Sequence, residues 1–412
     1  MYQILSGLRI VEASSFVAAP SAGMHLAQLG ADVIRLDQIG GGMDYRRWPK
    51  LGEESLYWEG LQKAKRSVAI NFRETEGREL AQAIITAPGE NAGLFVTNFP
   101  RNGFLSHETL AAKRKDLITM RVQGWSDGRS GLDFTINAVT GYPFSTGPDS
   151  LDNEAVSNQP VNHVLPAWDL LTGALGAMNL LAAERYRRET GQGQEIAMPL
   201  SNVAFSALGA LGQIAEVEVL NQDRPRLGNQ VFGAFGRDFA TRDGRHVMVV
   251  AISPKQWRGL LTALDLTAAM TALETALDVD LSSDEGVRFN HREAINPMIE
   301  HAVAQFDFDS LSKTFEANEV CWGPYQSLRK TIESHPELQA DSVLIDNVSH
   351  PSGATYRTPG SPGQYSVSER APAKPAPSLG ENTESVLTEI MGMNDAQIGQ
   401  LIERGIVANA VN

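Results

Sequence analysis

Short apolar segments alternate with helix-like segments through the first 125 residues, and this alternation limits the folds open to the chain. The segments with the length and composition of buried strands are 8–12, 32–36, 65–71, 93–97 and 117–122. Between them, residues 21–30 and 75–84 have the periodicity of helices. Strands that alternate with helices form a parallel sheet that helices cover on both faces. The sequence therefore predicts an α/β fold.

The composition changes near the middle of the chain, where residues 222–236 are rich in Arg, Pro, Gly and Asn. Such a segment is typical of a linker or of a loop that faces a substrate. Beyond it, residues 245–252 predict a strand, and helices are predicted over 254–264 and 307–317. These shorter elements predict a second, smaller α/β domain. Pro, Ser and Gly dominate residues 351–377, which we expect to cross the molecule in an extended conformation.

Charge and cysteine usage narrow the class of protein. The 412 residues carry a net charge of −14, which disfavours binding to nucleic acid or to an anionic membrane surface. The chain starts in a strand-like segment, without the basic region and apolar run of a signal peptide. Its single cysteine, Cys321, excludes an intrachain disulfide and forms no zinc-binding pattern. We therefore expect a cytoplasmic protein; Cys321 as a nucleophile is an alternative that no accompanying His motif supports.

Asp169 stands immediately before an apolar stretch of small residues over 170–183, and basic residues follow before Gly191. This pattern predicts a helix with Asp169 as its N-cap and Gly191 just after its end. A carboxylate at a helix N-terminus is stabilised as an anion, so we expect Asp169 to be ionised at neutral pH. An ionised carboxylate can act as a nucleophile. The alternative is that Asp169 only caps its helix.

The surroundings of Asp169 resemble those of the nucleophilic Asp in family III coenzyme A transferases. The shared features are Leu-Pro-x-x-Asp-x-x-Thr-Gly over 165–173, the helix of small residues, and Arg-Arg-Glu-Thr-Gly-Gln-Gly-Gln over 187–194. Further motifs occur in the family's order at 5–12, 29–37, 65–71, 98–99 and 379–383. The resemblance therefore spans almost the whole chain.

This resemblance implies a fold and a reaction. The fold it implies has a Rossmann-like large domain over 1–200 and 330–412, a small α/β domain over 225–325, and linkers over 201–224 and 326–329. Two ring-shaped subunits are expected to interlock as a homodimer. Asp169 is expected to attack a thioester carbonyl, which forms a mixed anhydride and then an aspartyl-CoA thioester. The acyl-CoA substrate supplies the CoA, and no other cofactor and no metal is expected.

Several side chains are candidates for binding the substrate. The loop after the first strand is expected to bind an oxyanion through the backbone N–H groups of Phe16, Val17 and Ala18; ordinary strand-to-helix packing is the alternative. The candidates for CoA binding are Lys65, Asn71, Phe72, Arg73, Asn98, Phe99 and Arg101. A solvated basic face is the alternative for their Lys and Arg members. The candidates for binding a second carboxylate of the substrate are Arg46, Arg47, His163 and Arg237.

A narrower resemblance concerns the reaction. Residues 39–49, 162–169 and 228–239 are similar to a branch of the family that moves CoA between the C1 and C4 carboxyls of one molecule of mesaconate. The alternatives are transfer between two molecules, for example from succinyl-CoA to a small carboxylic acid, and a CoA-binding scaffold without activity. A nicotinamide-dependent dehydrogenase is less favoured, because the first loop lacks G-x-G-x-x-G although Asp37 follows the second strand.

Overall fold

The computed structural model describes residues 1–149 and 159–410, and the chain forms two compact units. The larger comprises Met1–Thr140, Val164–Ala215 and Ser334–Asn412, and the smaller comprises Gly141–His163 and Glu216–Glu333. Residues 141–163 thus belong to the smaller unit, whereas the sequence predicts a large domain that runs to residue 200. The buried guanidinium of Arg226 accounts for this difference, because it donates to the carbonyl oxygens of Pro143 and Gln159 at 3.2 and 2.6 Å.

A seven-stranded sheet lies at the centre of the larger unit, and the predicted parallel arrangement is confirmed. Its order is β14-β5-β2-β1-β6-β7-β8, and β14 at the edge is antiparallel to its neighbour. The strands are β1 (Arg9–Ala13), β2 (Asp32–Gln38), β5 (Arg66–Ile70), β6 (Leu94–Thr97), β7 (Ile118–Gln123), β8 (Gln194–Pro199) and β14 (Val407–Ala408). Since β1 pairs with β2 on one side and β6 on the other, the loops after β1 and β6 meet at the carboxyl edge. Sheets of this kind bind ligands at that edge.

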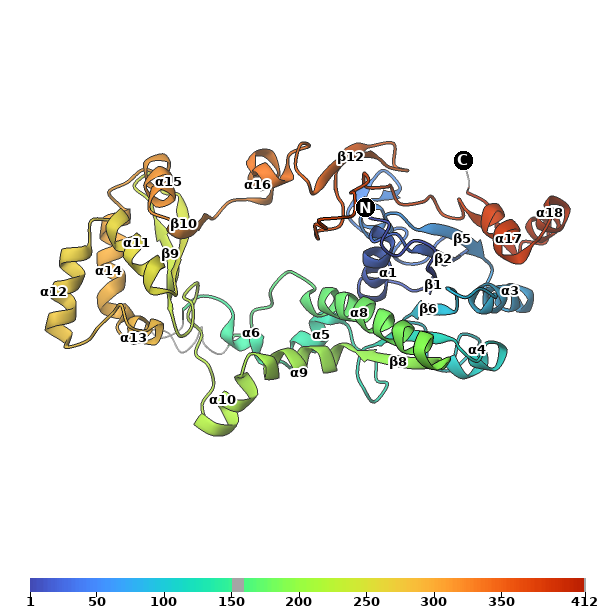
Figure 1. The fold of residues 1–412 in the computed structure, drawn as a ribbon, viewed down its shortest axis with the longest axis horizontal. Helices are drawn as coiled ribbons and strands as arrows, with labels where there is room; N and C mark the ends of the chain where they lie inside the picture. The colour runs from blue at the N-terminus through green and yellow to red at the C-terminus, as the bar shows by residue number, and fades with distance from the viewer. Residues whose placement is uncertain (150–158, 411–412) are drawn as a thin grey trace. The chain divides into compact units, whose positions relative to one another are not determined.

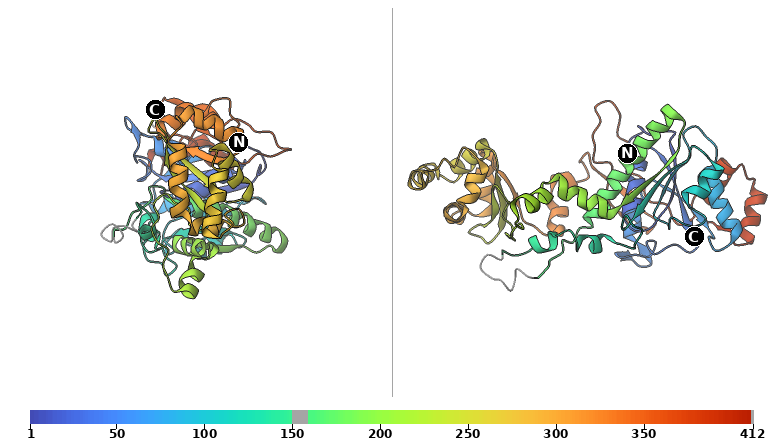
Figure 2. Two further views of the ribbon diagram at one scale, coloured as in Figure 1. Left: turned by 90° about the vertical axis from the view of Figure 1, so that its left-hand side faces the viewer. Right: turned by 90° about the horizontal axis from the view of Figure 1, so that it is seen from below.

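Helices cover both faces of this sheet (Figures 1 and 2). One face carries α3 (Thr75–Thr86), α4 (His107–Lys113), α17 (Thr383–Met391) and α18 (Asp395–Glu403). Their buried apolar side chains share one core with β1, β2, β5 and β6. The other face carries α1 (Ala18–Gln28) and α8 (Ala167–Thr190), which also pack against each other. Each fully buried Leu, Ile or Phe in such a core contributes roughly 1.5–3 kcal/mol, so apolar burial holds these layers together.

Gly173 allows α8 to approach the start of α1 closely. A Cβ atom at this position would lie 2.7 Å from the Ala18 carbonyl oxygen and 1.9 Å from Ser21 Oγ, so any side chain here would clash with backbone. Asp169 precedes Gly173 by about one helical turn. The close approach therefore brings Asp169 to the end of α1 that follows the β1 loop.

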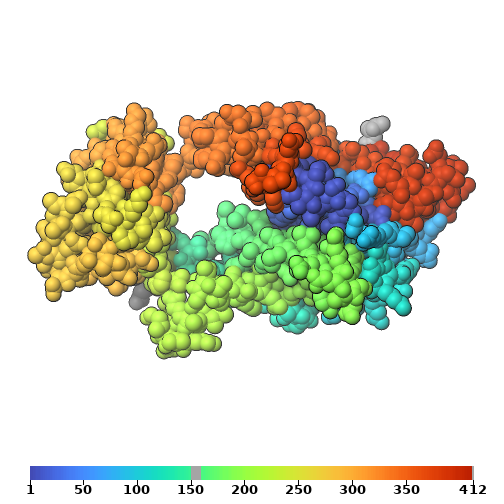
Figure 3. All heavy atoms as spheres, viewed as in Figure 1, coloured from blue at the N-terminus to red at the C-terminus, as the bar shows by residue number. Residues whose placement is uncertain are grey.

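The C-terminal segment completes the larger unit. Asn382 Oδ1 accepts a hydrogen bond from the Ser67 backbone N–H at 3.0 Å, and β14 pairs with β5. Figure 3 accordingly shows the red C-terminal residues packed against the blue N-terminal ones. β12 (Ile345–Ser349) and β13 (Thr355–Pro359) form a separate antiparallel pair, and residues 360–377 contain no helix or strand. The predicted extended segment over 351–377 is thus partly wrong, because residues 355–359 turn back to pair with β12, and its crossing of the molecule stays a prediction.

The smaller unit is also an α/β structure. Its antiparallel sheet has the order β11-β10-β9, with bounds Cys321–Pro324, His246–Ala251 and Phe235–Ala240. Its helices are α11 (Pro254–Ala263), α12 (Thr267–Leu277), α13 (Glu285–Asn290), α14 (Arg292–Val303) and α15 (Phe308–Ala317). Aromatic side chains lie at the centre of its core, where the Phe235 and Trp257 rings are 5.3 Å apart. This core is separate from that of the larger unit.

Short elements complete the chain. They are β3 (Lys50–Leu51), β4 (Glu54–Ser55), α2 (Leu56–Leu61), α5 (Asp133–Asn137), α6 (Tyr142–Ser145), α9 (Leu200–Ala210), α10 (Gln213–Leu220), α16 (Leu328–Ser334) and the 3-10 helix η1 (Pro336–Leu338). Within residues 1–149 and 159–410, no single helix has the length and apolar character that a bilayer crossing requires. Only α9 and α10 together meet these criteria, and a bend of 63° separates them.

Candidate active site

Asp169 lies in the first turn of α8 rather than at its N-cap. The helix begins at Ala167, and Pro166 occupies the N-cap position without a side-chain cap. The prediction that Asp169 caps the helix is therefore wrong, because the helix starts before the apolar pattern indicates. Asp133 supplies the missing acceptor, since its Oδ2 receives a hydrogen bond from the Asp169 backbone N–H at 3.0 Å. The start of α8 is thus fixed from outside the helix, and the Asp169 side chain is left available for chemistry.

The Asp169 carboxyl group is not held as an ordinary low-pKa anion. Burial raises its pKa to about 7, the neighbouring carboxylate of Asp133 acts in the same direction, and Arg47 opposes both. The expectation of full ionisation at neutral pH is therefore wrong, because desolvation and a like charge outweigh the helix N-terminus. Perturbed carboxyl groups of this kind are concentrated at functional sites.

Helix α5 places Asp133 beside α8. The Asp133 side chain is buried, and its Oδ1 has no hydrogen-bond partner in the part of the chain that the structure describes. A second contact reinforces the first, since Trp168 Nε1 donates to Asn137 Oδ1 at 3.1 Å. Two adjacent residues of α8 are thus hydrogen-bonded to the two ends of α5. The sequence analysis did not identify Asp133, because no motif marks a residue that acts through another residue's backbone.

The loop after β1 provides free backbone donors. Phe16 adopts a φ of 67°, in the left-handed region that non-glycine residues rarely occupy. Asn98 supports this loop, because its side chain bonds both the N–H and the carbonyl oxygen of Ser15, at 3.0 and 2.8 Å. Within the described residues, the N–H groups of Phe16, Val17 and Ala18 have no protein acceptor. Val17 is the N-cap of α1, Ala18 is its first residue and Phe16 precedes both, so these are unsatisfied donors at a helix N-terminus that an oxyanion can use.

The Arg47 guanidinium lies between two aromatic rings. Its central carbon is 5.4 Å from the centre of the Phe16 ring and 5.2 Å from that of the Tyr57 ring, both within cation–π range. Among the described residues no ion pair or hydrogen bond is formed by the Arg47 side chain, although its charge lowers the pKa of Asp169. The N–H donors lie in the plane of the guanidinium, along its edge, and are therefore available for a carboxylate near Asp169.

Tyr57 is a second site residue that the sequence analysis missed. Its hydroxyl is buried and has no hydrogen-bond partner within residues 1–149 and 159–410. Burial raises its pKa to about 12; Arg47 opposes this shift, and the charges of Asp44 and Asp169 add to it. The phenol is therefore protonated at neutral pH and can donate a hydrogen bond. A lone Tyr in a short helix gives no sequence signal of such a role.

Lys65 is wrong as a candidate for CoA binding. Its side chain is fully buried, and its ammonium group donates to Glu12 Oε2, the Pro20 carbonyl oxygen and Gln62 Oε1 at 2.8, 2.8 and 2.7 Å. An ammonium group has three donors, and all three are used. No donor remains for a phosphate, so the basic character of this segment comes from its other residues.

The remaining CoA-binding candidates lie in the larger unit with different environments. Arg73 is exposed, and its side chain has no partner among the described residues; Asn71 Oδ1 holds its backbone N–H at 3.1 Å. Phe72 and Phe99 pack edge to face, 6.1 Å apart, against the core. Arg101 is exposed and lies 3.7 Å from Glu195. Arg73 therefore has the freest donor group of the set, and its contact with CoA stays a prediction.

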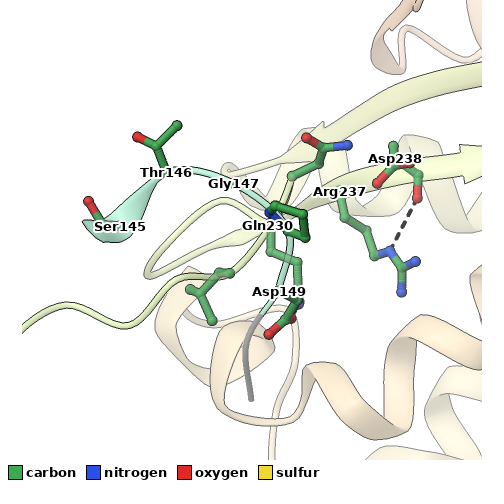
Figure 4. A pocket seen from close by; sticks show the side chains of 11 residues that line it. Ser145, Thr146, Gly147, Asp149, Gln230, Arg237 and Asp238 are labelled. Atoms are coloured by element: carbon green, nitrogen blue, oxygen red, sulfur yellow. Dashed lines mark hydrogen bonds between the residues drawn. The ribbon is translucent and has the colours of Figure 1, made fainter. Parts of the chain in front are cut away.

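The four candidates for a second substrate carboxylate divide between the units. Arg46 and Arg47 lie in the larger unit, and the Arg46 side chain is exposed. His163 and Arg237 lie in the smaller unit. Figure 4 shows Arg237 at a polar cavity of about 840 Å³, where its Nε donates to the Asp238 carbonyl oxygen at 3.1 Å. Gln230 also lines this cavity and donates to Asp149 at 3.0 Å. Of the four candidates, Arg47 is thus the one whose charge affects the pKa of Asp169.

The described geometry comprises a carboxyl group with a raised pKa, free backbone donors and an unpaired guanidinium at the edge of a parallel sheet. The model of CoA-transferase family III matches residues 5–383, and the chain belongs to this family. The family match and the loop after β1, which lacks the glycine fingerprint, leave the dehydrogenase alternative without support.

Relatives give a finer comparison. A 2-methylfumaryl-CoA isomerase from Chloroflexus aurantiacus is 47% identical over 410 residues, which cover 99% of this chain and 98% of the relative. A human succinyl-CoA:glutarate CoA-transferase is 26% identical, covering 98% and 90%. The crystal structure of a CaiB/BaiF family protein from Brucella suis matches with a TM-score of 0.74 at 24% identity, covering 95% of this chain and all of that one. This last likeness shows the fold.

Proposed function

We propose that this chain is a 2-methylfumaryl-CoA isomerase, which moves CoA between the C1 and C4 carboxyls of mesaconate. The observation that carries the proposal is the 47% identity to the Chloroflexus aurantiacus enzyme over nearly the full length of both chains. The succinyl-CoA:glutarate enzyme, at 26%, supports transfer between two molecules less well. The unpaired Arg47 near Asp169 suits an acyl group with a second carboxylate.

The reaction proceeds by four acyl transfers. Asp169 attacks the C1 thioester carbonyl, which gives a mixed anhydride and CoA thiolate. The thiolate attacks the Asp169 carbonyl carbon of the anhydride, which gives aspartyl-CoA and free mesaconate. The C4 carboxylate then attacks the aspartyl thioester, which forms a second anhydride and releases the thiolate again. The thiolate finally attacks the C4 carbonyl, which gives the C4 thioester and regenerates Asp169.

The surrounding residues have distinct roles in this scheme. The N–H groups of Phe16, Val17 and Ala18 stabilise the oxyanion that forms at each tetrahedral intermediate. Arg47 binds the carboxylate that is not reacting and keeps free mesaconate in the site. Because the same mesaconate molecule stays in the site, its effective concentration at the aspartyl thioester is far above that of any acid in solution. Arg73 pairs with a phosphate of CoA at a distance from the reacting carbon.

The proposal extends to the state of the protein in the cell. The chain acts on an acyl-CoA, needs no cofactor beyond the CoA of that substrate, and works as an interlocked homodimer in the cytoplasm. Sedimentation of the purified protein tests the dimer, with a mass near twice the 44.7 kDa of one chain expected. A monomer that turns over at the full rate contradicts this part of the proposal.

An isotope experiment tests the reaction itself. Unlabelled mesaconyl-C1-CoA is incubated with the protein and excess labelled free mesaconate, and the C4 thioester is analysed by mass spectrometry. Mostly unlabelled C4 product is expected. Extensive label in that product, or strong acceleration by added succinate, supports the intermolecular alternative. The absence of any C4 product supports a scaffold without activity and overturns the proposal.

A further inference from the structure

Arg35 lies in β2 and is almost completely buried, yet it contacts three other segments of the larger unit. Its Nη2 donates to the Ser14 carbonyl oxygen at 2.8 Å and to Asp44 Oδ2 at 2.9 Å. The central carbon of its guanidinium lies 4.8 Å from the centre of the Trp58 ring. Ser14 begins the loop after β1, Asp44 lies in the loop after β2, and Trp58 lies in α2. One guanidinium group thus joins three segments that have no sheet pairing with one another.

These three segments also carry the three members of the stack around Arg47. Phe16 follows Ser14 by two residues, Arg47 follows Asp44 by three, and Tyr57 immediately precedes Trp58. The two rings lie 5.4 and 5.2 Å from the Arg47 guanidinium. Each member of the stack is therefore held within three residues of a direct contact with Arg35.

The loop that carries Arg47 needs such an anchor. Gly40 and Gly41 both adopt positive φ values of about 80°, and residues 39–49 contain no helix or strand. Asp44 is the fully buried point of this loop, and its strong polar contact is the ion pair with Arg35. A buried carboxylate without its cation is costly, so this ion pair contributes to the position of the loop, together with the Ser55 hydroxyl, which donates to the Arg47 carbonyl oxygen at 2.6 Å.

We propose that Arg35, through its ion pair with Asp44, is a positioning residue that holds Arg47 between Phe16 and Tyr57 and so sets the preference for acyl groups with a second carboxylate. This inference rests on the proposed function of Arg47. Arg35 does not contact the substrate; it acts through the geometry of the three segments. Loss of the Arg35–Asp44 ion pair releases the segment that carries Arg47, whereas the Asn98 side chain still holds the Ser15 backbone of the loop with the oxyanion donors.

Arg35 also provides a matched control. Its Nε donates to Asp37 Oδ1 at 2.7 Å, so Asp37 and Asp44 are both buried carboxylates paired with the same guanidinium. Asp37 lies within β2, where its Oδ2 also accepts from Ser67 Oγ of β5 at 2.7 Å, whereas Asp44 lies in the Arg47 loop. Asp44→Asn and Asp37→Asn therefore remove the same charge from the same partner, and they differ in the segment that is released.

The test compares two thioesters that differ only in the second carboxylate. Mesaconyl-C1-CoA carries it, and tiglyl-CoA has a methyl group in its place. The release of CoA thiol from each is measured with hydroxylamine present to intercept acyl intermediates. The preference is the kcat/KM for mesaconyl-C1-CoA divided by that for tiglyl-CoA. Asp44→Asn is expected to lower this ratio about tenfold, because Asp44 and Arg47 belong to one contact network. Asp37→Asn is expected to leave this ratio within about twofold of wild type, since its segment stays in the sheet.

Two further variants keep the proposal testable if Asp44→Asn folds poorly. Arg35→Lys retains the charge but cannot bond Ser14 and Asp44 together, so both kcat/KM values are expected to fall, and the value for mesaconyl-C1-CoA is expected to fall further. In an Arg47→Ala background, Asp44→Asn is expected to have no further effect on the ratio. Equal loss on both thioesters, or an undiminished effect without Arg47, overturns the inference. Failure of the proposed function is a different result, because wild type then forms no C4 thioester.

Discussion

Arg35 and Arg47 are twelve residues apart in sequence, and their guanidinium groups differ in burial and in hydrogen bonding. Arg35 is buried and donates to Glu12, Asp37, Asp44 and the Ser14 carbonyl oxygen. Arg47 is exposed, lies over two aromatic rings, and has no side-chain acceptor among the described residues. The satisfied guanidinium is part of the scaffold, and the unsatisfied one is available to a ligand.

The same contrast separates Lys65 from Arg73 in the segment expected to bind CoA. Lys65 uses all its donors inside the protein, whereas the Arg73 side chain is exposed and unpaired in the described part of the chain. Charge in a sequence therefore does not distinguish a binding residue from a structural one. The distinction depends on how many hydrogen-bond donors of the side chain remain without an acceptor after folding.

The largest expected effect comes from removing the carboxylate of Asp169, the proposed nucleophile beside the unpaired Arg47. Asp169→Asn keeps the size of the side chain and should lower kcat at least about 10³-fold, since it removes the nucleophile itself. Rates of C4 thioester formation and circular dichroism spectra are measured together. A folded variant with the wild-type rate contradicts the mechanism.

Removal of the free guanidinium should have the next largest effect. Arg47→Ala should lower kcat/KM for mesaconyl-C1-CoA about 10- to 100-fold, because a charge-assisted hydrogen bond to the distal carboxylate is lost. Arg46→Ala, at the exposed neighbouring position, should have a much smaller effect. A larger loss from Arg46→Ala would transfer the role to that residue.

The raised pKa of Asp169 predicts how the rate depends on pH. In the proposed mechanism only the ionised carboxylate attacks, and its pKa is about 7, so kcat/KM should rise with pH and level off above neutrality. Below the pKa, the rate should fall about tenfold per pH unit. A profile that is flat between pH 5 and pH 8 would show that the carboxyl group is already ionised, as the sequence analysis expected.

Arg73 should affect binding more than chemistry. Arg73→Ala should raise KM for acyl-CoA about threefold and leave kcat nearly unchanged, because an exposed ion pair is weak and remote from the reacting carbon. Arg185→Ala removes the same charge from an exposed part of α8 and serves as the control. An equal rise in KM in both variants would point to general electrostatics.

The smallest expected effect is on stability. A carboxyl group with a raised folded-state pKa contributes stability below its unfolded pKa, and that contribution is lost as the pH rises through about 7. Asp169→Asn should therefore melt a few degrees above wild type at pH 8, and the difference should shrink at pH 5. Thermal melts at both pH values provide the measurement, and a variant less stable than wild type at pH 8 contradicts the raised pKa.

Local patterns were sufficient for several conclusions. The alternation of apolar strands and helices predicts the parallel sheet, and the apolar stretch after Asp169 with Gly191 beyond it predicts the helix α8. The close approach of Gly173 to the backbone of α1 became apparent only in the structure. The motif around Asp169 identifies the family, because the residue types and their spacing are preserved in the sequence itself.

Only the tertiary structure decided the state of the individual groups. It placed Asp133 beside Asp169 and raised the carboxyl pKa, and it buried Lys65 among three acceptors. It also joined Arg35 to Ser14, Asp44 and Trp58 from separate segments. Each of these outcomes depends on desolvation and on partners that are distant in sequence. Residue type and spacing determine which groups the chain possesses, and the packed fold determines which of them remain unsatisfied.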